Sequence, residues 1–497
     1  MGRERLPQTG PTEKPINKRL TTRGRRRISG RRPKAAGLGP EPKAGVAANT
    51  GIRRREPLSR AVASRSPGAS LAAVATAAAV AEQKQAGFGN LRHAALSAFW
   101  FGSNFLWIPL TTVLLQSQVD EVVPQRNLQN TGIGVALGVG GLLAMTVPPL
   151  VGAWSDRLHS RFGRRRPIMV AGTLLTFPGL LILMVAGSFP LVLIGYAIIQ
   201  FFFNAAGAAY AGIIPDVVPT QETGKASGFL ATMTQLGIGT GLGVTSLVGH
   251  NRAVYLVLGI VAFLSLAPTV WAARGEGETP VAPRPRRPLG ETISEFLRPL
   301  HEGDFAWVIF TRLMISSGIT AVLYFLLNFF RDVVLQTKSG AEAFTSNWLL
   351  VVVVTAIPFG FFGGLVSDRI HRRKIFVYLA GGAQAFVAIV FIALYPTAIP
   401  LVFALGVAYG VGYGLYFAVD WALACDTLPD PKASAKDMGL FHIALTLPQA
   451  VIPFFGGPLI DALNGPHGNG GYRVVFSSAV VFLFMGTVLV SRIKTVR

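Results

Sequence analysis

The stretch Gly152-Ala-Trp-Ser-Asp-Arg-Leu-His-Ser-Arg-Phe-Gly-Arg-Arg-Arg-Pro167 separates two apolar segments, and its first part recurs later in the chain. Gly364-Leu-Val-Ser-Asp-Arg369 repeats it at an offset of 212 residues. Two weaker matches lie at offsets of 210 and 211: Ile214-Pro-Asp216 with Ala424-Cys-Asp426, and Ala226-Ser-Gly228 with Asp437-Met-Gly439. Three matches at nearly one offset predict a chain built from two similar halves.

The apolar segments on either side of this stretch are long enough to cross a bilayer, which takes about 20 residues. Hydrophobic residues make up 51% of the chain and charged residues 14%, well below the level of about 25% in soluble domains. Twelve spans are predicted, six in each half: 93–116, 131–153, 167–187, 190–212, 226–248, 252–272, 305–330, 346–366, 375–395, 399–421, 437–460 and 472–491. The pattern predicts an all-α membrane protein and excludes a soluble enzyme and, with one Cys, a disulfide scaffold.

The net charge of +22 is concentrated before the first span. Residues 1–92 contain 20 of the 46 Lys and Arg and only 5 of the 24 Asp and Glu. This segment lacks apolar periodicity, so we expect a disordered basic cytoplasmic tail. It either only enforces topology or binds anionic lipid; nucleic-acid binding is not expected, since no aromatic residue precedes Phe88. The remaining predicted parts are a first six-helix bundle (93–272), a cytoplasmic linker (273–304) and a second six-helix bundle (305–497).

Lys and Arg in the loops predict the orientation of the spans. One set of loops and the C-terminal tail together hold 20 of these residues, including Arg157, Arg164, Arg165 and Arg369. The opposite set holds 5: Arg126, Arg252, Arg331, Lys338 and Arg473. Because cytoplasmic loops are the basic ones, we expect both termini and the linker to be cytoplasmic.

The loop from Gly152 to Pro167 resembles a motif of a known protein family. Its pattern Gly-x-x-Ser-Asp-Arg-x5-Gly-Arg-Arg resembles the motif between helices 2 and 3 of the major facilitator superfamily. The longer run from Ser155 to Pro167 resembles the sucrose-transporter-like branch, and more loosely the glycoside–cation symporters. Pro448-Gln449, after Gly439-x-x-His442, also resembles that branch, where an Asn often stands at the position of His442. The resemblance covers about residues 90–492 and implies two pseudo-symmetric six-helix bundles that alternate access to a central site.

The charged residues of this loop can act as a gate. An Asp at a helix end and Arg residues across a short turn can form charge-assisted pairs that hold one side closed. The alternative is that the Arg residues only anchor the loop at the cytoplasmic face. The predicted gating residues are Asp156, Arg157, Gly163, Arg164, Arg165, Asp368 and Arg369.

Ionisable residues inside spans are costly and usually mark function. Arg312 lies in the seventh span and Asp420 in the tenth, and each is a candidate partner of the other. Either they form a fixed structural ion pair, or they bind substrate or the coupling ion. A buried carboxylate is a plausible proton carrier, so Asp420 is the expected coupling residue.

Amide and aromatic side chains in the spans suit a ligand with many hydroxyl groups and an apolar ring face. The substrate-binding candidates are Asn104, Trp107, Asn204, Gln235, Tyr324, Tyr413, His442 and Gln449; each is also a candidate for ordinary helix packing. Plant-type sucrose transporters carry an Asp and an Arg in their fourth helix. Here Asn204 stands near the Asp position, and Ala211 and Gly212 stand near the Arg position.

These observations predict a secondary active transporter in the plasma membrane and not an enzyme. The expected activity is proton-coupled symport of a sugar or glycoside by a functional monomer, with sodium as the other candidate ion and with no metal site or cofactor. One alternative is a proton-antiport exporter of an amphipathic metabolite or drug. The other is a transport-inactive scaffold or sensor that uses the basic tail to recruit partners.

Overall fold

The computed structural model describes residues 88–155, 158, 160, 162–249, 251–274, 297–301, 303–427, 434–464 and 468–494. They all belong to one compact unit, Ser64–Arg497. The predicted tail up to residue 87, most of the predicted linker, and the gating candidates Asp156 and Arg157 lie outside the described residues.

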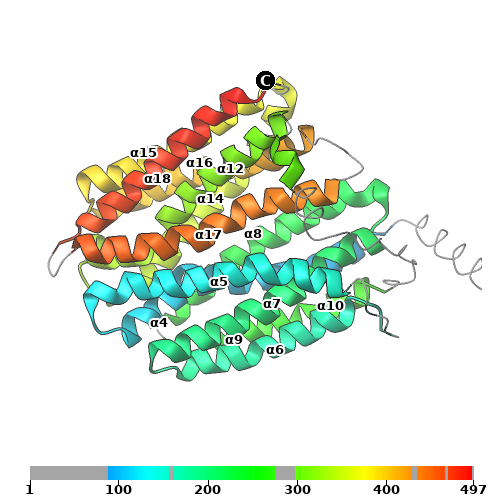
Figure 1. Ribbon diagram of the computed structural model, residues 1–497, viewed down its shortest axis with the longest axis horizontal. Coiled ribbons are helices and arrows are strands. Elements are labelled where there is room, and N and C mark those ends of the chain that lie inside the picture. Colours follow the sequence, from blue (N-terminus) through cyan, green and yellow to red (C-terminus); the bar gives the residue numbers. More distant parts are fainter. Residues whose placement is uncertain are drawn as a thin grey trace, which may run out of the picture. The chain divides into compact units, whose positions relative to one another are not determined.

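Every regular element in the described part of the chain is a helix (Figure 1). The elements of the first half are α3 (Asn90–Pro109), η1 (Leu110–Leu114), α4 (Leu115–Val122), α5 (Arg126–Ser155), α6 (Arg166–Val185), α7 (Phe189–Val217), η2 (Thr220–Glu222), α8 (Thr223–Val248), α9 (Val254–Leu264) and α10 (Leu266–Ala272).

The second half repeats this series of long helices. Its elements are η3 (Arg298–His301), α12 (Gly303–Leu323), α13 (Leu326–Phe329), η4 (Phe330–Val334), α14 (Ala341–Ile370), α15 (Arg373–Leu394), α16 (Ile399–Asp426), α17 (Ser434–Asn464), α18 (Gly470–Leu489) and η5 (Val490–Arg492).

Among the described residues, eleven helical segments are long and apolar enough to cross a membrane. The helix α8 falls outside this set because it is rich in Gly and Thr, which lower its hydropathy. It is nevertheless 26 residues long, or about 39 Å at about 1.5 Å per residue. That length exceeds a hydrocarbon core of about 30 Å, and α8 takes the place of the predicted span 226–248.

The first and seventh spans run further than the sequence predicted. The first was expected to end at residue 116, but α3, η1 and α4 continue without a break to Val122. The seventh was expected to end at residue 330, but η4 continues to Val334. The second extension lies in the wide π-helical turn η4, and the first follows shortly after the π-helical turn η1; such turns often occur at functional sites. The apolar pattern stops at the polar residues from Gln116 onward and at Arg331, so both ends were predicted to be loops.

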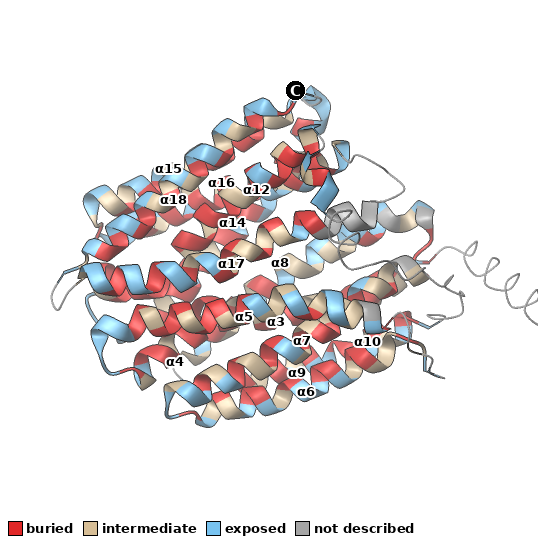
Figure 2. Ribbon diagram, in the orientation of Figure 1, coloured by how far each residue is buried: buried red, intermediate tan, exposed pale blue. Residues whose placement is uncertain are grey.

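Apolar side chains pack inside the halves and also face outward, as expected in lipid. One core cluster is formed by residues of the first half, and two others are formed mainly by residues of the second half. Exposed residues lie along the outward faces of helices such as α6 and α18 (Figure 2). They include the large apolar side chains of Leu174, Leu181 and Phe484.

The halves meet along α5 and α17, which run side by side across the middle of Figure 1. Gly134, Gly138 and Gly141 of α5 face Pro453, Phe454 and Ala450 of α17 so closely that a side chain at any of them would overlap the partner helix. In α8, Gly237 and Gly241 instead face α3, inside the first half, while Gly243 faces open space. The glycine-rich spans therefore serve two different contacts, one between the halves and one within a half.

Candidate functional site

The last residues before α6, Gly163 to Arg165, lie against the end of α7. Arg164 Nη2 lies 2.8 Å from Asp216 Oδ2, and Arg165 Nε lies 3.0 Å from the same oxygen. Gly163 has a φ of 95°, which turns the chain into the start of α6. The Arg165 guanidinium lies directly against Gly212, where a side chain would displace it. Asp216 belongs to the sequence repeat, but no role was predicted for it.

The second half repeats this arrangement. Arg373 Nε, at the start of α15, lies 2.9 Å from Asp426 Oδ2 at the end of α16, and its Nη2 lies 3.5 Å from Asp368 Oδ1. Arg369 is exposed. In both halves, therefore, an Arg at the start of the third helix binds an Asp at the end of the fourth. We call this the inner end of the protein, following the orientation predicted from the Lys and Arg count.

Replacing Asp216 by Asn should destabilise the protein more than replacing Asp426 by Asn. The Asp216 side chain is 15% exposed and serves two Arg residues, whereas Asp426 is 40% exposed. We expect Asp216→Asn to lower the free energy of unfolding by about 1.5–3 kcal/mol. Asp426→Asn should lower it by less than about 1 kcal/mol. Thermal unfolding followed by Trp fluorescence measures both; equal losses would contradict the assignment.

A second polar contact at the inner end joins η2 to the start of α3. Phe88 N donates to Glu222 Oε1 at 3.0 Å, and His93 Nε2 lies 2.7 Å from Glu222 Oε2. The hydrogen bond with His93, and then the one from Phe88, hold the pKa of Glu222 below its ordinary value.

A carboxyl group with a lowered pKa stabilises the folded state above its unfolded pKa, about 4.3 for Glu. That contribution disappears as the pH falls through the lower folded-state pKa. We therefore expect the unfolding midpoint of the wild type to fall more steeply below about pH 4 than that of Glu222→Gln. Thermal scans over a pH series test this, and parallel curves would contradict it.

Arg312 and Asp420 form a direct ion pair between α12 and α16. Both are buried, with relative exposures of 6% and 4%. The Arg312 guanidinium also lies 3.8 Å from the centroid of the Phe441 ring. Arg312 Nε and the buried hydroxyl of Tyr416 have no hydrogen-bond partner among the described residues. The pair lies wholly within the second half, and His442 is near enough to interact with Arg312 electrostatically.

The structure brings some of the substrate-binding candidates together. Tyr324, between α12 and α13, packs against the core of the first half. It is close enough to interact electrostatically with Tyr196 of α7 and Tyr413 of α16. Trp107 packs edge to face against Phe203, with ring centroids 5.5 Å apart. Tyr324, Tyr196 and Tyr413 therefore meet where the two halves face each other, whereas the contact of Trp107 with Phe203 lies within the first half.

The amide candidates and His442 differ in their hydrogen bonds and in their burial. Asn204 Nδ2 donates to Gln200 Oε1 at 2.7 Å, and Gln200 Nε2 donates to Tyr196 Oη at 2.6 Å, forming a polar row along α7. Asn104 Nδ2 donates to Trp100 O of its own helix. Gln235 and Gln449 are half-buried, and His442 is exposed on α17. Gln200 and Tyr196 were not among the sequence-predicted candidates, although Tyr196, Gln200 and Asn204 follow one another at intervals of four residues, which places all three on one helix face.

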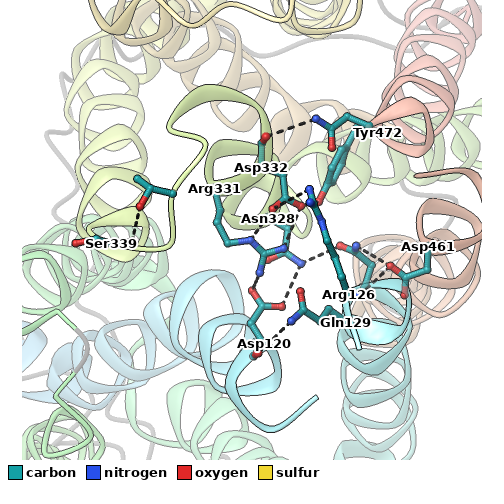
Figure 3. Close-up of polar contacts among 12 residues, drawn as sticks. Asp120, Arg126, Gln129, Asn328, Arg331, Asp332, Ser339, Asp461 and Tyr472 are labelled. Atoms are coloured by element: carbon teal, nitrogen blue, oxygen red, sulfur yellow. Dashed lines mark hydrogen bonds and ion pairs between the residues drawn. The ribbon is translucent and has the colours of Figure 1, made fainter. Parts of the chain in front are cut away.

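A third group of polar residues, drawn in Figure 3, was not predicted as a site from the sequence. It lies at the opposite end of the protein, where α4 stands in Figure 1. We call this the outer end, and we call the group the outer cluster. Its members are Asp120 of α4, Arg126, Gln129 and Asn130 of α5, Asn328 of α13, Arg331 and Asp332 of η4, Asp461 of α17 and Tyr472 of α18.

The outer cluster connects the two halves. Arg331 pairs with Asp120. Asp461 accepts hydrogen bonds from Asn130 Nδ2 at 2.8 Å and from the Thr131 backbone N–H at 2.6 Å. Asn328 Nδ2 donates to Asn130 Oδ1 at 2.9 Å. Of the charged members, Arg126 and Arg331 were predicted only as loop residues, and Asp120, Asp332 and Asp461 were not predicted to have any role. Burial of Asp120 and Arg331 depends on contact between the two halves, which the sequence does not show.

Comparison with known proteins agrees with this architecture. The family model of the Major Facilitator Superfamily matches residues 94–435 and, again, 313–496. The chain belongs to the Major Facilitator Superfamily. Members of this superfamily and the solved structures that match are transporters, so this Major Facilitator Superfamily chain is a multi-pass membrane transporter and not an enzyme.

One curated relative is the rat protein called Proton-associated sugar transporter A. It is 25% identical over 207 residues, a region that covers 36% of this chain and only 26% of the rat protein. The solved structures share the superfamily fold at low identity. A point mutant of the nucleoside transporter NupG has a TM-score of 0.63 at 14% identity, covering 82% of this chain and all of that one. A D-xylose-proton symporter has a TM-score of 0.59 at 16% identity, covering 82% of this chain and 98% of that one.

Proposed function

We propose that the protein moves a sugar or a related glycoside across the plasma membrane by proton-coupled symport with alternating access. In this proposal the termini are cytoplasmic, so the inner end faces the cytoplasm and the outer end faces outward. The inner-end pairs of Arg164 and Arg165 with Asp216, and of Arg373 with Asp426, form and break as that end closes and opens. The protein works as a monomer.

Two observations support a sugar as the substrate. The names of the rat relative and of one solved neighbour refer to sugar transport with protons. The residues where the halves meet also combine phenol rings with amides, such as Tyr324, Tyr196 and Asn204. Rings and amides of this kind can stack on a sugar face and hydrogen-bond its hydroxyl groups.

The observation that carries the proton coupling is the buried pair of Arg312 and Asp420. A carboxylate inside a membrane span stays charged only if a neighbouring group stabilises its charge. The Arg312 guanidinium does this for Asp420. Protonation of Asp420 would release Arg312, whose Nε has no partner among the described residues. The pair can therefore exist in two states that differ by one proton, as a symporter requires.

Uptake by purified protein in lipid vesicles tests this function. An inward proton gradient is imposed, and a panel of labelled sugars and glycosides is offered with and without a protonophore. We expect protonophore-sensitive accumulation of at least one sugar, accompanied by proton entry. Indifference to every sugar, with efflux of amphipathic dyes driven by the gradient, would support export by antiport instead.

A further inference from the structure

The outer end joins the halves through a guanidinium that is shared between them. Arg331 of η4 pairs with Asp120 of the first half. Its Nε also lies 2.7 Å from Asp332 Oδ1, the neighbouring residue of its own half. Asp120 and Arg331 are 8% and 6% exposed, so water screens their attraction poorly.

This sharing makes the contact between the halves reversible. If Asp120 loses its charge, Arg331 still has Asp332, which also accepts a hydrogen bond from Tyr472 Oη at 2.8 Å. The buried Arg331 is thus never left unpaired, which is the state that makes a broken buried ion pair costly. Asp120 in turn keeps a contact with Asn328 Nδ2 at 3.5 Å. Loss of the Asp120 charge therefore removes the ion pair of Arg331 across the interface and leaves Arg331 paired within its own half.

The surrounding charges leave Asp120 as the group that controls this contact. The titratable and charged groups that face it, or belong to its cluster, are Arg331, Asp332, Lys338, Arg126, Asp461 and Tyr472. Asp461 is already held by amide hydrogen bonds. Asp332 lies in the same half as Arg331, and its one ion pair across the interface that the described residues show is the longer contact of 3.7 Å with Arg126, whose side chain is 51% exposed. Asp120 is thus the carboxylate whose charge binds Arg331 across the interface.

Each of the two helical segments that carry the pair contains a π-helical turn. Asp120 follows the π-helical turn η1, which separates α3 from α4. Arg331 lies inside the π-helical turn η4, after a break between α12 and α13. Such turns allow the outer ends of the first and seventh helices to move without bending the rest of each helix.

We propose that Asp120 binds the coupling proton on the outer side and that its protonation releases Arg331, so that the outer ends of the halves separate. This inference rests on the proposed proton-coupled transport, in which Asp420 is a second, separate proton-binding residue. Opening of the outer end, on the side of higher proton concentration, would then expose to substrate the residues where the halves meet. Loss of the proton from Asp120 would restore the ion pair with Arg331 and close the outer end.

Distances between spin labels test this without a known substrate. Cys425, the single Cys, is replaced by Ser, and labels are attached at Asn127→Cys in the first half and Ser339→Cys in the second, both exposed sites at the outer end. The full chain in lipid nanodiscs is measured from about pH 8 to about pH 5, a range in which carboxyl groups inside proteins titrate. We expect acidification to raise the long-distance population several-fold.

Three variants separate Asp120 from other causes. Asp120→Asn should show the long-distance population at every pH, while Asp120→Glu should restore the pH response. Glu121→Gln is the matched control, because Glu121 lies on the same helix but pairs with Arg252 inside the first half. It should behave as the wild type. The proposed function is tested separately, by uptake. A wild-type pH response in Asp120→Asn, or no response in the wild type, would overturn the inference.

Discussion

Asp420→Asn should abolish proton-driven accumulation and also destabilise the protein. The substitution leaves Arg312 buried at 6% exposure without its carboxylate partner. Breaking a buried ion pair on one side typically costs about 3–5 kcal/mol. We expect a loss of that size in the free energy of unfolding, and at least about a tenfold loss in accumulation, a factor that corresponds to about 1.4 kcal/mol. Thermal unfolding and vesicle uptake measure the two effects.

A double variant separates the structural role of the pair from the coupling role. Replacing both members with apolar residues, as in Arg312→Met with Asp420→Leu, removes the unpaired charge, and such replacements are often neutral or stabilising. We expect the double variant to recover most of the stability but none of the proton-driven accumulation. Arg369→Gln, at an exposed position, serves as the surface control. Accumulation in the double variant would show that Asp420 carries no coupling proton.

Gly457→Val should stop the transport cycle by keeping the halves apart. A side chain at Gly457 of α17 would overlap the backbone carbonyl of Asn130 in α5, and backbone cannot move aside as a flexible side chain can. Overpacking usually costs about 1–3 kcal/mol. Here separation of the two helices relieves it, so we expect the outer end to remain open. Transport should fall at least about tenfold, a barrier change of about 1.4 kcal/mol.

The matched control is Gly243→Val, because a side chain at Gly243 of α8 meets open space. That variant should transport as the wild type does. The spin-label pair at positions 127 and 339 should report the long-distance population in Gly457→Val at every pH. Normal transport by Gly457→Val, or an equal loss in Gly243→Val, would contradict the assignment of this contact to closure of the outer end.

The repeat and the apolar spans predicted much of the fold. The match between 152–157 and 364–369 predicted two similar halves, and the superfamily assignment confirms the fold. Sequence reasoning also named Arg312 and Asp420 as mutual partners, because a charge inside a span needs an opposite charge nearby. The structure pairs them directly. Their role in coupling stays a prediction.

The outer cluster was missed for a physical reason. Asp120 and Arg331 are 211 residues apart, and in the sequence each stands at the polar edge of an apolar segment, where charged loop residues are ordinary. Hydropathy is a property of one segment of the sequence. It therefore does not distinguish a solvated charged side chain from a charged side chain buried against another helix. Asp216 was visible in the repeat, but nothing in the sequence placed it beside Arg164.

The sequence by itself determined the membrane class, the two halves and the superfamily, since each depends on composition or on spacing along one segment. The tertiary structure decided which charges are paired, which glycines touch another helix and which tyrosines meet between the halves. Those properties depend on how α5 packs against α17 and on how α4 approaches η4. Packing between distant helices sets them, because an ion pair or a close backbone contact is formed by two surfaces and is encoded in neither alone.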